Sequence, residues 1–333
     1  MNINTPLVLA PVYKDYFWGG DRLKTDFHKE TEVSPLAESW ELACHAKGCN
    51  TILTAPYTGM TLRDLIVQNG NAFLGSYCKN CEAVPIMVKL IDAKEGTSVQ
   101  VHPNDSFGMK AAGQPGKAEL WYILEAEPDA YIYHGLRYAI TQEWMYMSIQ
   151  DKSLLNIMNK IYVHPGDAYY VPAGSLHAVG PGVVLAEISQ NSDVEFRVYD
   201  YHRKNEEGQY RPLQMDTAIA AAYCTTLNAT PQNLPQRIEG GQTRLLWTCS
   251  WFQANLYTVE TAIALSVDST SFQHILVVDG QGTLHAQGET VPLQKGSSVL
   301  LPAELGDISV EGRCQCIRSK VAKPLNGPQY HFA

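Results

Sequence analysis

Short apolar runs separated by turn-forming residues dominate the chain. Most runs end at Gly, Pro, Asn or Asp, and this alternation is typical of an all-β sandwich or barrel. The runs therefore predict strands at residues 86–90, 120–124, 168–171, 183–188, 274–278 and 298–301.

Helical periodicity is confined to fewer segments. Residues 61–69 space their apolar side chains at helical intervals after a glycine, and residues 213–224 are rich in alanine. Residues 141–160 begin with a threonine that can cap a helix, and their pattern predicts a pair of helices. Helices are thus expected as insertions in a mainly β fold.

A weak internal repeat flanks a predicted linker. Residues 228–243 (NATPQNLPQRIEGGQT) carry prolines, adjacent glycines and few apolar side chains, which predicts a domain boundary near residue 235. On either side, residues 166–173 (GDAYYVPA) and 296–303 (GSSVLLPA) share a glycine, five mostly apolar residues, a proline and an alanine. We interpret the chain as one β-barrel unit used twice, at 1–235 and 236–333, with residues 141–160 inserted in the first copy.

Candidate metal ligands cluster around the first copy of the repeat. The string G-x5-P-x-G-x2-H, which ends at His177, matches the second signature motif of the cupins, and its turns would bring that histidine to the barrel mouth. Gln100 and His102 share one face of a predicted strand, and Glu119 begins another. Two imidazoles and a carboxylate suit a catalytic zinc site but equally a non-haem iron site. Glu119 could instead pair with Lys117, and Gln100 could simply form hydrogen bonds.

Basic side chains in apolar surroundings are the next candidates. Lys89 interrupts the run IMVKLI, Lys117 shares a strand face with Glu119, and Arg197 alternates with apolar neighbours in SDVEFRVYDY. Each could also be a surface or salt-bridged residue. An anionic substrate is compatible with the overall acidic balance, because a few basic side chains inside a cleft decide the local field.

Composition limits the classes of molecule that the chain is expected to bind. The chain has 333 residues, a net charge of −9 and no Lys/Arg cluster, so nucleic acid and anionic membranes are poor partners. The N-terminus lacks a secretory signal pattern and no apolar stretch is long enough to span a bilayer, which predicts a cytoplasmic location. The single C-x-x-C, at Cys78 and Cys81, has no second pair at zinc-site spacing, so the eight cysteines are expected to be free thiols.

Four segments resemble one enzyme family. VQVHPND (99–105), GKAELWYIL (116–124), PGDAYYVPAGSLHAVGPG (165–182) and EISQNSDVEFRVYDY (187–201) closely resemble the type I mannose-6-phosphate isomerases, most of all their short bacterial form. The resemblance is strong over residues 10–225 and implies two cupin-type β-barrels (jelly rolls), the second degenerate. There Glu304 stands where the first copy has Gly174, and Asp307 stands where it has His177.

The resemblance also implies a site and a reaction. It implies one zinc ion per chain, held by Gln100, His102, Glu119 and His177, and catalytic roles for Arg197, Lys117 and Asp193. Lys89, Lys117 and Arg197 are the expected substrate-binding residues. The implied reaction interconverts mannose 6-phosphate and fructose 6-phosphate through a cis-enediol.

Two other functions remain open from the sequence: an iron-dependent cupin dioxygenase, and a sugar-binding cupin without catalysis. The general base and the oligomeric state are also open.

Overall fold

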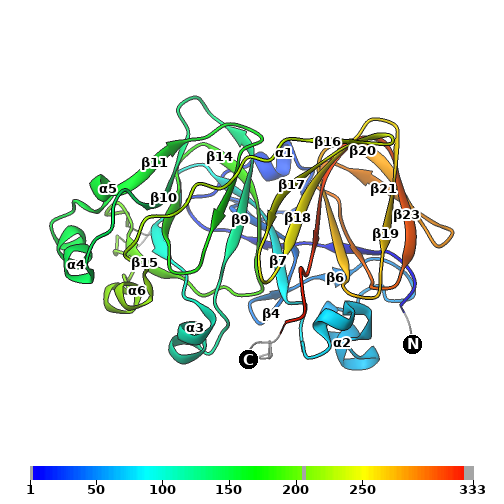
Figure 1. The fold of residues 1–333 in the computed structure, drawn as a ribbon, viewed down its shortest axis with the longest axis horizontal. Helices are drawn as coiled ribbons and strands as arrows, with labels where there is room; N and C mark the ends of the chain where they lie inside the picture. The colour runs from blue at the N-terminus through cyan, green and yellow to red at the C-terminus, as the bar shows by residue number, and fades with distance from the viewer. Residues whose placement is uncertain (1–2, 205–207, 326–333) are drawn as a thin grey trace.

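The computed structural model describes residues 3–204 and 208–325, and it is built mainly from antiparallel strands. Two β-structures lie side by side, the first coloured green and the second orange (Figure 1). All six predicted strand segments are strands in the structure, so the mainly β prediction is confirmed.

The first barrel consists of two sheets. One is ordered β12-β9-β14-β7-β3-β2 and the other β11-β10-β13-β8-β15. The central strands of the first sheet are buried along their whole length, which explains their nearly continuous apolar sequence. The strands are β2 (Val12–Lys14), β3 (Glu38–Leu42), β7 (Ile86–Ala93), β8 (Val99–Val101), β9 (Glu119–Ala126), β10 (Tyr131–Leu136), β11 (Met158–Tyr162), β12 (Ala168–Val171), β13 (Leu176–Val179), β14 (Val183–Gln190) and β15 (Phe196–Tyr199).

The second barrel is built around the two longest strands, β20 and β23, which pair with each other and with four further strands of its sheet. Its strands are β16 (Gln236–Ile238), β17 (Gly241–Thr248), β18 (Gln253–Val259), β19 (Ala262–Val267), β20 (Gln273–Ala286), β21 (Glu289–Gln294), β22 (Ser298–Leu301) and β23 (Gly306–Lys320). Two strands from the start of the chain complete the sheet: β1 (Leu7–Ala10) pairs with β22 and with β6 (Thr51–Ile52). A short hairpin, β4 (Cys44–His45) and β5 (Gly48–Cys49), stands apart.

The helices are short and lie at the outside. Three of them, α4 (Gln142–Gln150), α5 (Leu154–Ile157) and α6 (Met215–Ala221), gather at the outer end of the first barrel, while α2 (Leu62–Asn69) lies beneath the second (Figure 1). A reciprocal cap between Thr61 and Asp64 starts α2. The other helical elements are α1 (Arg22–Thr25), α3 (Asp105–Ala112) and the single turns Ala72–Leu74 and Ser76–Cys78.

Two local predictions need correction. The predicted pair of helices at 141–160 ends at Ile157, because Met158 begins β11 and pairs with Leu136. Helix α3 is not among the predicted helices: Asn104 accepts a hydrogen bond from the backbone NH of Phe107 and caps a helix there.

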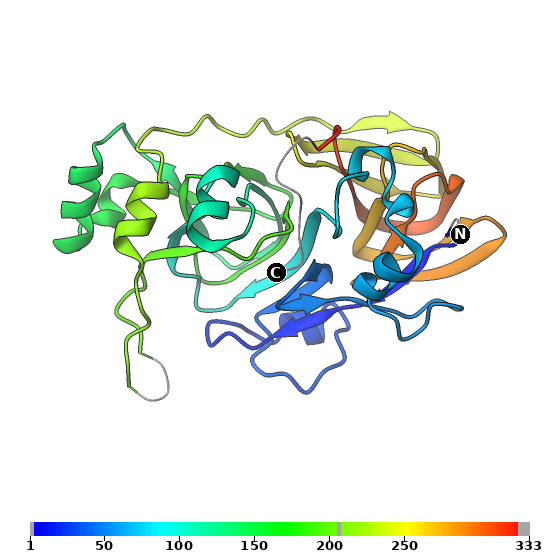
Figure 2. The same ribbon diagram turned by 90° about the horizontal axis from the view of Figure 1, so that it is seen from below.

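The two barrels share one apolar core. Leu90 and Leu120 of the first barrel belong to the same buried cluster as Leu276 and Leu300 of the second. The chain crosses between the barrels without regular structure before β16, along one side of the molecule (Figure 2). Because β16 starts inside the predicted linker, the linker is shorter than expected, and the boundary near residue 235 stays a prediction. No helix in the described ranges has the length and apolar character that a membrane crossing requires.

Candidate metal and substrate site

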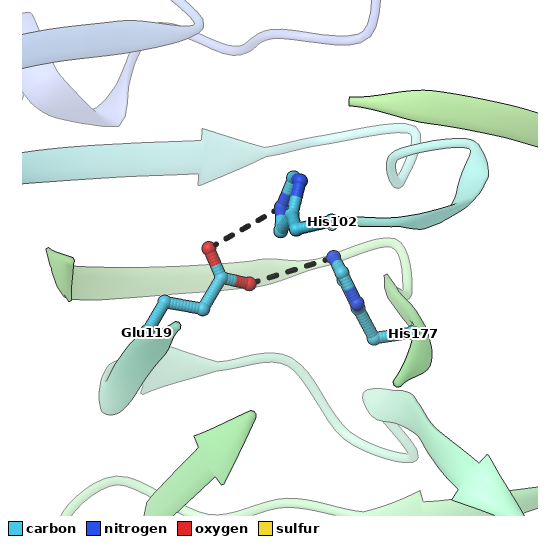
Figure 3. A group of neighbouring side chains, drawn as sticks. All are labelled: His102, Glu119 and His177. Carbon is cyan, nitrogen blue, oxygen red and sulfur yellow. Dashed lines mark ion pairs between the residues drawn. The ribbon is translucent and has the colours of Figure 1, made fainter. Parts of the chain in front are cut away.

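Three ligand-type side chains meet inside the first barrel. His102 follows β8, Glu119 begins β9 and His177 lies on β13, and their ligand atoms are all within 4.8 Å of one another (Figure 3). His102 Nε2 lies 3.5 Å from Glu119 Oε2, and His177 Nε2 lies 3.5 Å from Glu119 Oε1. All three residues are buried. The two independent sequence signals, the G-x5-P-x-G-x2-H string and the Q-x-H pair, therefore converge as predicted.

Backbone contacts orient both imidazoles. His102 Nδ1 lies 2.7 Å from the carbonyl oxygen of Val194, and His177 Nδ1 lies 2.9 Å from that of Ser175. Since a carbonyl can only accept, each Nδ1 carries a proton, and in the neutral form of the ring Nε2 then presents a lone pair toward Glu119. His102 Nε2 is buried without any hydrogen-bond partner. A buried lone pair left unpaired is costly, and a metal ion would satisfy it.

A glycine turn links the two histidine segments. Gly174 has a φ of +85°, and its backbone NH donates a 2.7 Å hydrogen bond to the carbonyl of His102. A Cβ at this position would lie 2.6 Å from the ring of Tyr223. The glycine of the motif is therefore needed for both its backbone conformation and its lack of a side chain.

Burial and charge set the protonation of the triad. Burial lowers the pKa of His177 to about 3, so its imidazole is neutral and can act as a ligand. Burial opposes ionisation of Glu119, but the charge of Lys117 holds the pKa of its carboxyl well below the usual range. Two imidazoles and one carboxylate are a donor set that fits a divalent transition metal.

The predicted fourth ligand lies next to the triad. The amide nitrogen of Gln100 is 3.4 Å from His177 Nε2. The two ends of a glutamine amide are nearly isosteric, so a half-turn of that amide would direct its oxygen to the same point. Ligation by Gln100 stays a prediction.

The triad borders a cavity of about 230 Å³ with mixed charge. Five carboxylates and five cationic side chains line it, so a divalent ion would make the local balance positive and favour a phosphorylated substrate. The charged lining residues are Glu38, Glu119, Glu187, Asp193, Glu195, Lys47, Lys89, Lys117, Arg197 and Arg211. All predicted site residues except His177 are among the lining residues.

Lys117 is clamped between two carboxylates. Its Nζ lies 2.8 Å from Glu119 Oε2 and 2.8 Å from Glu187 Oε1. Burial disfavours its charge, but these two carboxylates raise the pKa of Lys117 above its ordinary value. The two carboxylates therefore favour the charged form of Lys117, which presents a positive charge to the cavity.

The remaining predicted residues lie around the same cavity. Arg197 is opposite Gln100 in the β15–β8 ladder, and its guanidinium contacts Glu195 Oε1 at 2.5 Å and Ser98 Oγ at 3.2 Å. Lys89 lines the cavity but is almost fully buried, with Nζ 3.4 Å from Glu38 Oε2.

Asp193 lies at the cavity wall with its carboxylate 2.6 Å from Lys47 Nζ. Burial opposes ionisation, yet the charges of Lys89 and Lys47 lower the pKa of Asp193 below its ordinary value. Asp193 is therefore ionised at neutral pH.

Sequence reasoning missed several lining residues. Glu187 is the Cα partner of Lys89 and holds Lys117, and it interrupts the apolar run VVLAEIS just as Lys89 interrupts IMVKLI. The same criterion would have found it. No comparable signal marks Tyr16, Trp18 or Lys47, because their segments reach the cavity only through the fold.

Known proteins resemble both parts of the chain. Residues 7–134 match the family described as "Phosphomannose isomerase type I, catalytic domain", and residues 242–321 match "Mannose-6-phosphate isomerase, cupin domain". The "Mannose-6-phosphate isomerase ManA" of Bacillus subtilis is 33% identical over 94% of this chain and 98% of its own length. The "Mannose-6-phosphate isomerase" of Streptococcus mutans is 29% identical over 94% of this chain.

Solved structures give the same relationship. The crystal structure of the mannose 6-phosphate isomerase from Bacillus subtilis matches with a TM-score of 0.88 and 31% identity, over 95% of this chain and 99% of that one. A putative mannosephosphate isomerase from Archaeoglobus fulgidus matches with a TM-score of 0.77 at 19% identity, over 96% of this chain and 99% of that one, which extends the likeness of fold alone.

Proposed function

Since the chain belongs to the type I mannose-6-phosphate isomerases and interconverts mannose 6-phosphate and fructose 6-phosphate, we propose that it does so with one zinc ion bound by Gln100, His102, Glu119 and His177. The observation that carries the proposal is the unpaired, buried Nε2 of His102 facing Glu119 beside His177. The donor set fits zinc, which is commonly bound by imidazole and carboxylate with a position left for substrate.

Zinc in this place would act as a Lewis acid that polarises a sugar oxygen. The surrounding side chains do the rest. Arg197 and Lys117 are both fixed cations at the cavity, and they stabilise the negative charge that develops on the sugar oxygens of the enediolate. Lys117 keeps its proton throughout, because the carboxylates of Glu119 and Glu187 stabilise its charge.

We assign Asp193 a role in ring opening. Its ionised carboxylate lines the cavity and accepts the proton of the anomeric hydroxyl, while Lys47 holds the carboxylate in place. Lys89 lines the cavity and also forms an ion pair with Glu38. Lys89, Lys117 and Arg197 together supply positive charge for the sugar phosphate.

We also propose a division of labour along the chain. Residues 1–235 form the catalytic unit and residues 236–333 a barrel without a metal ion. Support comes from the His/Cys/Asp/Glu groups of residues 3–204 and 208–325: only the triad has three such ligand atoms close enough together to hold a metal.

The test is a coupled assay for fructose 6-phosphate formed from mannose 6-phosphate, run with purified enzyme before and after chelation and combined with metal analysis. We expect one zinc per chain, loss of activity with the metal, and recovery on adding zinc. Full turnover by protein stripped of all metal would overturn the zinc proposal, and recovery with Fe²⁺ but not Zn²⁺ would replace zinc by iron. The isomerase assignment would stand in both cases.

A further inference from the structure

Two cysteines face each other across the β4–β5 hairpin. Cys44 and Cys49 are Cα partners in this antiparallel pair, and their Sγ atoms are 3.5 Å apart. Antiparallel partners have Cα atoms about 4.5–5.5 Å apart, which lies within the range of about 4.4–6.8 Å that a disulfide spans. The two thiols can therefore be joined with only a small movement of the backbone.

The hairpin reaches the active cavity. Lys47 lies in its turn, lines the cavity and forms the 2.6 Å ion pair with Asp193. His45, beside Cys44, contacts the side-chain oxygen of Gln114 at 3.0 Å, and the same oxygen accepts from the backbone NH of Asp193 at 3.3 Å. Two routes thus connect the cysteine pair to Asp193.

We propose that Cys44 and Cys49 form a thiol–disulfide exchange site, and that their oxidation shifts the hairpin and weakens the hold of Lys47 on Asp193. The oxidant is a low-molecular-weight disulfide. The thiolate of Cys49 attacks one of its sulfurs and releases one thiolate, and Cys44 then loses its proton and attacks the mixed disulfide at Cys49 Sγ, releasing a second. The small disulfide is reduced to two thiols while the two cysteines are oxidised to one disulfide, so electrons and protons balance.

The two thiols differ in exposure and in pKa, as the proposed order of attack requires. Cys49 is half-buried and Cys44 fully buried, so only Cys49 can meet a reagent first. Hydrogen bonding with Cys44, opposed by burial and assisted by the backbone NH and charge of Arg63, lowers the pKa of Cys49 to about 7. The hydrogen bond with Cys49 and, after it, burial raise the pKa of Cys44, as suits a thiol that reacts second.

The chain contains a matched comparison. Cys78 and Cys81 also contact each other, but both are buried in the shared core. Their lack of exposure should shield them from a small disulfide, although their sequence spacing is the one usually associated with redox chemistry.

The experiment equilibrates the zinc-loaded full-length enzyme with glutathione at varied ratios of disulfide to thiol, without oxygen. Peptide mass spectrometry then measures cross-links at both cysteine pairs, and the isomerase assay measures kcat and KM. We expect a Cys44–Cys49 cross-link that forms and reverses with the ratio, no cross-link at Cys78–Cys81, and a kcat/KM about 10-fold lower in the oxidised enzyme. Cys49→Ser should keep kcat/KM constant across all ratios.

Absence of the Cys44–Cys49 cross-link in oxidised glutathione would overturn the site, whatever the activity shows. A complete cross-link with unchanged kcat and KM would overturn the coupling to Lys47. The coupling rests on the proposed role of Asp193, whereas the cross-link, read by mass, does not. The cross-links are measured in the protein without any substitution. The proposal can therefore be tested even if Cys49→Ser folds poorly.

Discussion

The two barrels contain the same strand positions but fill them with different chemistry. In the first, Glu119 on β9 is the Cα partner of Val171 on β12. In the second, Gln273 on β20 is the Cα partner of Leu301 on β22, at the same place in the repeat. A carboxylate in one barrel therefore corresponds to a neutral amide in the other.

The strands that carry the other predicted ligands show the same kind of difference between the two barrels. His177 on β13 is the partner of Gln100 on β8, whereas Asp307 on β23 is the partner of Ser266 on β19. The alignment of Asp307 with His177, inferred from the repeat, agrees with this register. The register also gives the counterparts of the predicted ligands. Gln100 corresponds to Ser266 and His102 to Asp268. Glu119 corresponds to Gln273 and His177 to Asp307.

An arginine lies at the altered site of the second barrel. Arg318 pairs with Ile275 as Glu187 pairs with Trp121, so it replaces the carboxylate that holds Lys117 in the first barrel. Its Nε lies 2.5 Å from Gln273 Oε1, and one terminal nitrogen lies 2.6 Å from the carbonyl of Ser266. The second barrel thus places a positive charge of its own against these positions, where the first barrel has ligands for a separate ion.

The largest expected difference is between variants of His177 and of Asp307, its counterpart in the second barrel. His177→Ala should remove zinc and lower kcat by roughly 10³-fold or more, because the metal loses a ligand that has no substitute. Asp307→Ala, its counterpart, should leave both unchanged. Metal analysis and the coupled assay on the two variants check this. Near-normal turnover by zinc-free His177→Ala protein would refute the metal site.

The next effect distinguishes two arginines. Arg197→Lys keeps the charge but loses the planar guanidinium, so kcat should fall by roughly 10²-fold with little change in KM if this side chain stabilises the enediolate. Arg318→Lys should leave kcat as it is. Steady-state kinetics at confirmed zinc content decides the matter. A raised KM with an unchanged kcat would instead make Arg197 a phosphate-binding residue.

A smaller effect concerns stability alone. Arg318→Met should lower the free energy of unfolding by about 2 kcal/mol, because Gln273 Oε1, which is almost fully buried, loses its charged donor. The kcat of this variant should stay within about 2-fold of the parent, since Arg318 lies outside the catalytic barrel. Urea unfolding at fixed zinc concentration measures the first quantity. Equal midpoints for variant and parent would show that the guanidinium does not stabilise the second barrel.

The smallest expected effect, counted per pH unit, is a pH dependence of stability that arises in the second barrel. Burial, with a contribution from Lys29, lowers the pKa of His274 to about 3. The unfolded chain then binds a proton that the native state does not, so stability is complete above the ordinary histidine pKa of about 6.5 and falls as the pH drops from there toward 3. The loss should be roughly 1 kcal/mol per pH unit in the middle of this range.

Replacing the histidine tests this dependence. His274→Gln should flatten the slope of unfolding free energy against pH, while His285→Gln, at a much more exposed position, should not. Urea unfolding of chelated protein from pH 7 to pH 5 provides the measurement and avoids changes in metal binding. Parallel slopes for His274→Gln and the parent would rule out this source of acid sensitivity.

The sequence predicted features that depend on neighbours along the chain. Strand alternation, the glycine turn before His177 and the Q-x-H pair are local patterns, and each has its expected place in the structure. Helix α3 was not predicted because an asparagine such as Asn104 is an equally good signal for a helix cap and for a turn.

Local patterns could not predict contacts between residues that are far apart in the sequence. Nothing near Arg318 indicates that Gln273 is its partner, and nothing near Lys47 indicates Asp193. Such contacts depend on strand register and on how the two barrels pack. Periodicity within a segment carries no information about either.

The pairing of β1 with β22 has a consequence for synthesis on the ribosome. Leu7 leaves the ribosome long before its partner Leu300. β1 must remain without this neighbour until β22 has been made, and an unpaired apolar strand invites association with other chains. Completion of the second barrel is thereby tied to a strand that precedes the first barrel in the sequence.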